Sequence, residues 1–291
     1  MPERDVKVAY LIRAHHAPKL LERLIRRLVG PEAGVFVHVS LSAADTVYEE
    51  MVSRLDEVEG VHWLERRTCR YGGFSLVEAS LAGLDAIAER GPLPGHTLLL
   101  SGQDYPLRPR TEVEAFLEQA GQQSFLHHGA IPSAAWRPER GGLDRVQHVY
   151  FERFRYRTRL LRLPFVTRRF PEGLWPYGGS AFWALSATAV DYVRRFVRDN
   201  PRVMRFFRHT LIPDELFFQT VLLNSPLRDT IVNEELHFVD WSGGSAHPAT
   251  LGLADLDRVL ASGKLFARKF DPADTEVLDQ LDRAALAGDR R

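Results

Sequence analysis

Thr97-Leu98-Leu99-Leu100-Ser101 is an apolar run of strand length, and Gly102-Gln103-Asp104 follows it directly. Continuous apolar strands are typical of parallel sheets that are covered on both faces. Residues 6–12, 34–39 and 61–64 form similar runs, separated by segments with helical periodicity at 18–28, 48–55 and 76–88. Strands that alternate with helices in this way predict βαβ units, and so an α/β fold with a mostly parallel, Rossmann-like sheet flanked by helices.

The carboxyl ends of these strands carry polar and aromatic residues. Ligands of open parallel sheets bind beyond those ends, so this edge is the predicted binding site. The residues placed there are His15 and His16, His38 and Ser40, Arg70 and Tyr71, and Gln103 and Asp104.

Length and composition limit the class of protein. The chain has 291 residues, of which 45% are hydrophobic, and neither a repeat nor a low-complexity tract interrupts it. These values favour one large domain over residues 1–291. Lys+Arg and Asp+Glu are both 38, so global charge favours neither nucleic acid nor membrane as a partner. A single cysteine excludes an intramolecular disulfide and suits a reducing compartment.

One local basic segment lies between residues 153 and 169. It could face an acceptor or phosphate, contact an anionic membrane, bind single-stranded nucleic acid, or form a solvated loop. Zero net charge disfavours nucleic acid among these alternatives. The arginines are Arg153, Arg155, Arg157, Arg159, Arg162, Arg168 and Arg169, and Tyr150, Phe151, Phe154 and Tyr156 interleave with them.

Several common chemistries lack their motifs. The glycine pairs do not have the spacing or the lysine of a phosphate-binding loop. The histidines do not form a metal-binding helix pattern, and no Gly-x-Ser-x-Gly nucleophile motif occurs. No Asp-x-Asp is present to clamp a diphosphate through a divalent metal, so basic side chains would have to neutralise it. Lys264, Arg268 and Lys269 are the cationic candidates.

Pro213-Asp214-Glu215 places two carboxylates after a proline and before an apolar run. Proline suits the first turn of a helix, and negative charge is favoured there. An acidic helix start accounts for this segment taken alone. A carboxylate kept ionised in apolar surroundings is also a candidate general base.

Seven ordered motifs together resemble glycosyltransferase family 14, which comprises the core-2/I-branching β-1,6-N-acetylglucosaminyltransferases and the peptide O-xylosyltransferases. They run from about residue 6 to 283, so the resemblance covers nearly the whole chain. The motifs are Ala9-Tyr10-Leu11-Ile12-x-Ala14-His15, Tyr71-Gly72-Gly73-Phe74-Ser75, Leu100-Ser101-Gly102-Gln103-Asp104-Tyr105-Pro106, Gly178-Gly179-Ser180-x-Phe182-Trp183, Pro213-Asp214-Glu215-x-Phe217-Phe218, Asp240-Trp241-x-Gly243-Gly244-Ser245-x-His247-Pro248 and Leu265-Phe266-Ala267-Arg268-Lys269-Phe270.

This resemblance implies a GT-A fold and an inverting transfer from a UDP-sugar without a metal or other cofactor. It makes Glu215 the general base and places Lys269 at the donor diphosphate, with Arg268 and His247 beside it. It places Asp104 near the donor sugar or nucleotide, and Ala14, His15, Arg70 and Tyr71 along the nucleotide site. Residues 6–110 then form the nucleotide-sugar half, and residues 120–283 form the half for the acceptor and the base.

The chain departs from the family at two positions. The family's His-Val-Asp is His38-Val39-Ser40 here, which removes an aspartate that helps to hold uridine, and Tyr71 replaces a common tryptophan. The absence of an anchor segment and of disulfides leads us to expect a bacterial-type, cytoplasmic member, with peripheral contact to the inner membrane face as an open alternative. A glycan, glycoside or other hydroxyl compound is the expected acceptor, facing residues 127–175. A non-catalytic sugar-binding module is the alternative function, because fold does not imply function.

Overall fold

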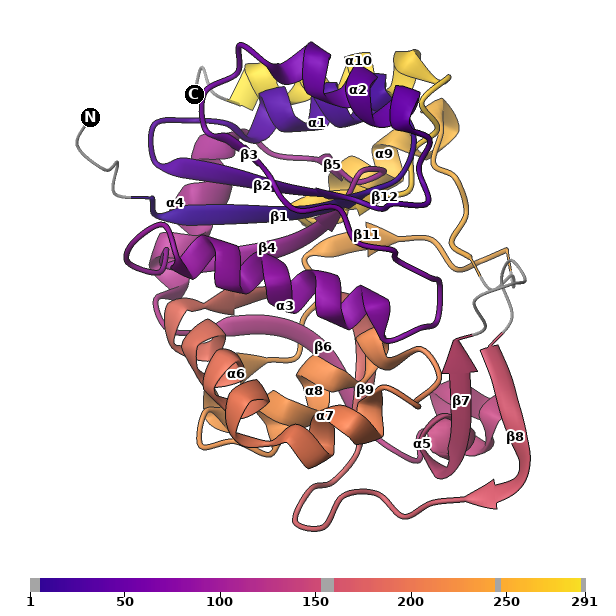
Figure 1. Ribbon diagram of the computed structural model, residues 1–291. Helices are drawn as coiled ribbons and strands as arrows, with labels where there is room; N and C mark the ends of the chain where they lie inside the picture. Colours follow the sequence, from indigo (N-terminus) through magenta and orange to yellow (C-terminus); the bar gives the residue numbers. More distant parts are fainter. Residues whose placement is uncertain (1–5, 153–159, 244–246, 289–291) are drawn as a thin grey trace. The chain divides into compact units, whose positions relative to one another are not determined.

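The computed structural model describes residues 6–152, 160–243 and 247–288, and its chain forms two compact units (Figure 1). The first unit combines Met1–Arg66, Pro94–Gly121 and Glu235–Arg291, and the second combines Arg67–Leu93 and Gln122–Glu234. Both units are assembled from segments that are separated in the sequence.

The first unit contains the predicted parallel sheet. Its strands are β1 (Val8–Ala14), β2 (Ala33–Val39), β3 (Val61–Trp63) and β4 (His96–Ser101), in the order β4-β1-β2-β3. All three pairings are parallel, and the residues of β2 are buried throughout, as continuous apolar runs require. The α/β class and the Rossmann-like sheet are therefore confirmed.

Helices cover this sheet through apolar stripes. In α1 (Pro18–Leu28) the buried residues recur at helical spacing, namely Leu20, Leu21, Leu24, Ile25 and Leu28. The other helices of the first unit are α2 (Asp45–Leu55), α4 (Arg110–Ala120), α9 (Leu256–Ala261) and α10 (Thr275–Gly288), with a 3₁₀ turn at Leu253–Asp255.

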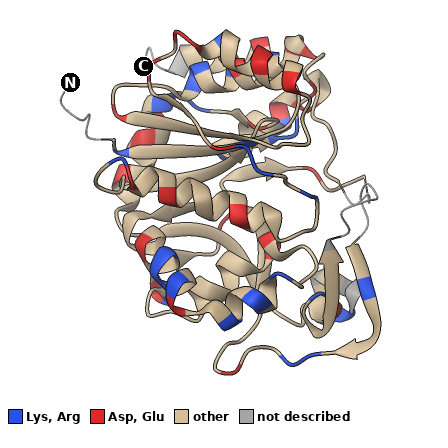
Figure 2. Cartoon of the chain, in the orientation of Figure 1, with Lys and Arg blue, Asp and Glu red and all other residues tan. Residues whose placement is uncertain are grey.

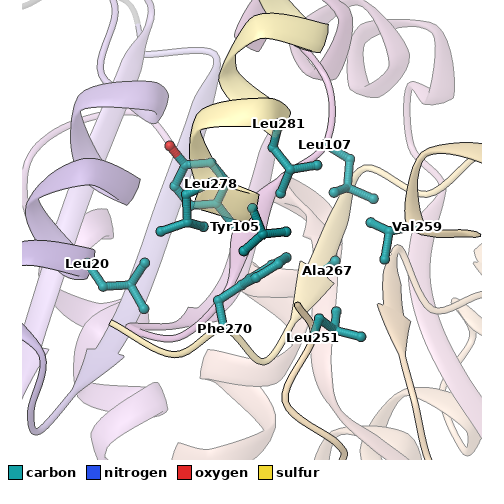
Figure 3. Packing of buried hydrophobic residues seen from close by; sticks show 10 residues of the cluster. Leu20, Tyr105, Leu107, Leu251, Val259, Ala267, Phe270, Leu278 and Leu281 are labelled. Atoms are coloured by element: carbon teal, nitrogen blue, oxygen red, sulfur yellow. The ribbon is translucent and has the colours of Figure 1, made fainter. Parts of the chain in front are cut away.

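A small second sheet joins distant segments of the first unit. In it β12 (Phe266–Arg268) pairs parallel with β11 (His237–Val239) and antiparallel with β5 (Tyr105–Pro106). Figure 3 shows the apolar cluster that fixes these strands, in which Tyr105 and Phe270 lie beside the leucines of α10. The ring centroids of Tyr105 and Phe270 are 6.1 Å apart in an edge-on arrangement. This packing brings the end of the chain against the segment that follows β4.

The second unit has a mixed sheet. Its β6 (Ser124–Ala130) pairs antiparallel with β9 (Tyr177–Ser186) and parallel with β10 (Ile231–Val232). Gly178 and Gly179 lie within β9 itself and not in a turn before it. A Cβ on Gly179 would overlap the His127 carbonyl, so only glycine allows β6 and β9 to approach at their bulge.

Helices and a hairpin complete the second unit. The hairpin pairs β7 (His148–Glu152) antiparallel with β8 (Leu160–Thr167). The helices are α3 (Ser75–Ala88), α5 (Leu143–Gln147), α6 (Ala187–Asp199), α7 (Pro201–Phe207) and α8 (Phe217–Leu223), with 3₁₀ segments at Ala134–Gly142, Pro213–Glu215 and Arg228–Thr230.

Both signs of charge occur on the helices of each unit, in keeping with zero net charge (Figure 2). Among the described residues, none of the helices has the length and apolar character needed to span a bilayer.

An ion-pair network secures α10 within the first unit, and we expect Asp282→Asn to weaken it. Asp282 accepts from Arg23 Nη2 at 2.7 Å, Arg27 Nη1 at 2.7 Å and the Tyr105 hydroxyl at 2.8 Å. Losing the charge leaves two half-buried guanidinium groups poorly paired, so the free energy of unfolding should fall by about 2 kcal/mol in urea titrations.

The matched control is Asp279→Asn, because Asp279 contacts Arg23 at 2.6 Å but its side chain is 52% exposed. That variant should lose less than about 1 kcal/mol. Equal losses in both variants would contradict a special role for Asp282.

Candidate functional site

Asp104 lies at the carboxyl end of β4 and is completely buried. The turn that follows β4 closes on its carboxylate, because the Ser101 backbone N–H donates to Oδ2 at 2.8 Å and the Ser101 hydroxyl donates to Oδ1 at 2.6 Å. The prediction placed Asp104 just past a buried strand, and the structure confirms that position.

A guanidinium and an imidazole from the small sheet complete the surroundings of Asp104. Arg268 Nε donates to Oδ1 at 3.1 Å, and His237 Nε2 lies 3.2 Å from Oδ2. Burial would raise the pKa of Asp104, but contact with His237, the Arg268 charge and the Ser101 hydrogen bond outweigh it and hold the pKa below its ordinary value. The buried carboxylate thus fixes Arg268, while its predicted contact with the donor stays a prediction.

The end of β1 brings Ala14, His15 and His16 to the start of α1. Ala14 is buried. A Cβ added to Gly102 would lie only 3.2 Å from the Cβ of Ala14, so the turn after β4 packs closely on Ala14. The rings of His15 and His16 are 4.2 Å apart. Partial desolvation lowers the pKa of both, and Lys269 lowers that of His16 further, which favours neutral imidazoles here.

The segment after β11 is held by Asp240. Its Oδ1 accepts from the Ser242 N–H at 2.8 Å, and its Oδ2 accepts from Arg258 Nη2 at 2.5 Å. The hydrogen bonds from Ser242 and the Arg258 contact lower the pKa of Asp240 to about 2. Trp241 and His247 are exposed on either side of residues 244–246, which lie outside the described residues.

Glu215 belongs to the second unit. Pro213–Glu215 is one 3₁₀ turn, and α8 begins only at Phe217, so the expected continuous helix from Pro213 is wrong. Ile212, with φ 48°, turns the chain into this segment, and its N–H donates to the Gly72 carbonyl at 2.9 Å. Asp214 is 8% exposed, whereas the Glu215 side chain is 30% exposed. Of the two carboxylates, Glu215 is the one that solvent or a ligand reaches.

Arg145 and Trp136 accompany Glu215, and neither was predicted. Arg145 Nη1 lies 2.6 Å from Glu215 Oε2, and its guanidinium carbon lies 4.1 Å from the Trp136 ring centroid. Arg145 is seventy residues away in sequence and carries no motif of its own, so no local pattern could have found it.

Arg70 and Tyr71 also lie in the second unit, just before α3. The Arg70 N–H donates to Ser75 Oγ at 3.0 Å, and the Gly73 N–H donates to the Arg70 carbonyl at 3.0 Å. Tyr71 is 60% exposed, so its ring is presented at the surface. The structure thus places the predicted residues in two groups, with Ala14, His15, Asp104, His247, Arg268 and Lys269 in the first unit and Arg70, Tyr71 and Glu215 in the second.

The arginine-rich segment is only partly described, because residues 153–159 lie outside the described residues. Arg168 points inward and donates to the Val146 and Phe206 carbonyls and to Thr210 Oγ1, at 3.0, 2.6 and 2.8 Å. Burial lowers the pKa of Arg168 to about 10. Arg168 is thus a structural residue of the second unit, unlike the exposed Arg162 and Arg169.

Asp104→Asn should destabilise the protein strongly. Replacing the charge leaves Arg268 and the Ser101 donors facing an amide, which should cost about 3 kcal/mol in urea unfolding at neutral pH. Because the folded pKa of Asp104 lies below its unfolded value of about 3.9, its contribution is complete above about pH 5 and disappears as pH falls through the folded pKa. The difference between wild type and variant should therefore narrow on acidification. The exposed Asp271→Asn is the control, and a pH-independent difference would contradict the assignment.

Among the described residues, no group of three or more His, Cys, Asp and Glu side chains is placed to hold a metal ion. Arg268, held by Asp104, and Lys269, whose charge acts on His16, are two cationic groups of the first unit suited to an anionic ligand.

Comparison with known proteins gives the family. The family model of the Core-2/I-Branching enzymes matches residues 8–260. Xylosyltransferase 1 of Rattus norvegicus is 29% identical over 97% of this chain and 36% of its own length. Xylosyltransferase 1 of Homo sapiens is 30% identical over 97% and 31%, and xylosyltransferase 2 of Rattus norvegicus is 31% identical over 95% and 33%.

The chain spans about a third of the length of these curated relatives. One solved structure, 4-diphosphocytidyl-2C-methyl-D-erythritol synthase from Anaerococcus prevotii, covers 70% of this chain and 83% of its own, with a TM-score of 0.35 and 11% identity. That likeness is too low to bear on the site. The family match extends from β1 to α9, across the segments that carry Asp104 and Glu215, and the chain belongs to the Core-2/I-Branching enzyme family.

Proposed function

We propose that this protein is an inverting, metal-independent glycosyltransferase that moves a sugar from a UDP-sugar to an acceptor hydroxyl. The observation that carries the proposal is the partly exposed Glu215 carboxylate, ion-paired with Arg145 in a chain of this family. An accessible carboxylate held beside a guanidinium is suited to accept a proton from a bound hydroxyl.

In the proposed reaction the acceptor oxygen attacks the anomeric carbon from the face opposite UDP. The new C–O bond forms as the bond between the anomeric carbon and the diphosphate oxygen breaks, and UDP leaves with that electron pair. Glu215 takes the hydroxyl proton, and the product is a β-glycosidic bond. General-base assistance of this kind contributes about 10²–10⁴-fold to the rate.

Basic side chains of the first unit are proposed to hold the donor. Lys269 and Arg268 would neutralise the diphosphate, with His247 beside them and Ala14 and His15 along the nucleotide. Arg70 and Tyr71 of the second unit are proposed as further nucleotide contacts. Asp104 is completely buried, so it would lie near the donor and act on it through Arg268. Arg268 is already oriented by buried Asp104, so little side-chain entropy would be lost on binding. N-acetylglucosamine and xylose are the candidate sugars, and the names of the relatives favour testing UDP-xylose first.

The acceptor is proposed to be a glycan, a glycoside or another hydroxyl compound, and the site of action to be the cytoplasm of a bacterium. A non-catalytic sugar-binding module is the second candidate, because Ser40 stands where the family has an aspartate. Ser40 Oγ lies 2.8 Å from Ser42 Oγ, so its hydroxyl takes part in the turn after β2. Binding of UDP-sugars without donor hydrolysis or transfer to any acceptor would favour that module.

Glu215→Gln should slow transfer severely while leaving donor binding intact. The amide keeps the size of the side chain but cannot accept the proton, so kcat should fall at least about 10²-fold. Radiolabelled-donor transfer assays and calorimetric titration with UDP measure the two effects. The exposed Glu172→Gln serves as control, and normal turnover in Glu215→Gln would remove Glu215 from this role.

Transfer should persist in excess EDTA, because the proposed donor site relies on cations of the protein and not on a divalent metal. The measurement is the initial rate after dialysis against chelator, with and without added Mn²⁺. Complete loss of activity that Mn²⁺ restores would contradict the metal-independent mechanism.

We also propose peripheral contact with an anionic membrane through the hairpin of β7 and β8. The described part of this hairpin carries exposed apolar side chains at Phe151, Leu161, Phe165 and Val166, and Phe165 is fully exposed. Exposed arginines accompany them at Arg162 and Arg169. Apolar side chains beside arginines are complementary to an interface of acyl chains and acidic headgroups.

Vesicle sedimentation tests this contact. The protein should pellet with vesicles containing phosphatidylglycerol more than with pure phosphatidylcholine, and less at high salt. Phe165→Ser should reduce pelleting severalfold, whereas Leu286→Ser, at an exposed apolar residue outside the hairpin, should not. Equal pelleting by wild type and Phe165→Ser would overturn the contact.

A further inference from the structure

Arg145 is the most enclosed charged neighbour of Glu215 that the described contacts reveal. It is 9% exposed and lies on α5, in the second unit with Glu215. A buried guanidinium needs a counter-charge, and the carboxylate at 2.6 Å supplies it. The pair is therefore a fixed feature of this unit and not a surface ion pair of small effect.

The guanidinium plane is held by an aromatic ring. Trp136 lies in the 3₁₀ segment before α5, and its ring centroid is 4.1 Å from the Arg145 guanidinium carbon. Two glycines make room for this ring, because a Cβ on Gly178 or on Gly142 would overlap it. Stacking fixes the direction in which the donors of an arginine point, and a lysine could not be fixed in this way.

The backbone joins this arrangement to the turn that carries Glu215. The Leu211 N–H donates to the Arg145 carbonyl at 3.2 Å, and the next residue, Ile212, donates to Gly72. Gly178 also packs closely against Leu216, since a Cβ added to Gly178 would lie 3.0 Å from Leu216 Cδ2. The same few residues thus position both partners of the ion pair.

We propose that Arg145, stacked on Trp136, is a positioning residue for the catalytic base, orienting the Glu215 carboxylate and favouring its ionised form. This inference rests on the proposed function of Glu215. Arg145 need not contact either substrate for the effect, because an oriented carboxylate presents its proton-accepting electron pair in one direction. A misplacement of about 1 Å at such a group can cost about a hundredfold in rate.

Several other charged groups lie near the 213–215 turn and contribute to the electrostatic surroundings of Glu215. Asp214 precedes Glu215 in sequence, and α3, which packs on the turn, carries Glu78 and Asp85. Glu78 pairs with Arg208 at 2.9 Å, and Asp85 pairs with Arg194 at 2.7 Å. The β9 strand contributes Tyr177, α8 contributes no ionisable residue, and α5 adds Asp144, 3.6 Å from Arg140.

The experiment compares Arg145→Met and Arg145→Lys in transfer assays from pH 4 to 9, a range of about five units chosen to include carboxylate and imidazole titrations. Arg145→Met should lower kcat about a hundredfold with the KM for the UDP-sugar unchanged. The acidic limb of its kcat/KM profile should move up by about one pH unit, because the charge that favours ionised Glu215 is gone. Arg145→Lys keeps the positive charge, so the acidic limb should stay at its wild-type pH, but kcat should be only partly retained because a lysine is not held by stacking.

The double variant Arg145→Met with Glu215→Gln separates positioning from other roles. If Arg145 acts through Glu215, adding Arg145→Met to Glu215→Gln should cost no further activity. Additive losses, or a raised acceptor KM with an unmoved acidic limb, would instead make Arg145 an acceptor contact and overturn the inference. Thermal unfolding and UDP titration check the fold of each variant, and Arg145→Lys serves if Arg145→Met does not fold.

The outcomes also separate this inference from the proposed function. Normal turnover in Glu215→Gln would reject Glu215 as the general base, and Arg145 would then have no catalytic base to position. An inactive Glu215→Gln beside a fully active Arg145→Met leaves the proposed function standing and rejects Arg145 alone.

Discussion

The charge of Asp104 has no access to water, and the first unit is organised around its neutralisation. An ionised carboxylate is tolerated in a protein interior only where hydrogen bonds and opposite charge replace its hydration. Ser101 supplies two donors from the turn after β4, and Arg268 approaches from β12. The arrangement couples the parallel sheet to the small sheet, so the position of the Arg268-Lys269 pair follows from a buried electrostatic requirement.

The second unit uses a carboxylate differently. Glu215 keeps part of its surface exposed, and its partner Arg145 is the buried member of the pair. Burying the cation while the anion stays accessible suits a group that must exchange a proton with a ligand. Asp104 satisfies its charge inside the protein, whereas Glu215 can engage something outside it. That contrast in burial gives a physical reason to assign the two acids different roles.

Family membership and site geometry answer different questions. The match over residues 8–260 establishes the family, while the relatives are about three times longer than this chain. Sugar, acceptor and mechanism therefore rest on the chemistry of the residues themselves. The Arg145 and Trp136 arrangement illustrates this, because it consists of contacts between side chains that no sequence motif contains.

Hydrophobic periodicity and the order of the sequence motifs by themselves determined much of what can be said of this protein. Buried strands must be continuously apolar, so 97–101 and its counterparts read directly as a parallel sheet, and polar residues at the strand ends marked Asp104. Motif order indicated Glu215 and its family. Tertiary structure alone decided that Pro213–Glu215 is a separate turn, that Gly178 and Gly179 lie inside β9, and that Arg145 meets Glu215. These features depend on close approach between segments far apart in the chain, and local sequence patterns contain no information about which distant side chains will meet.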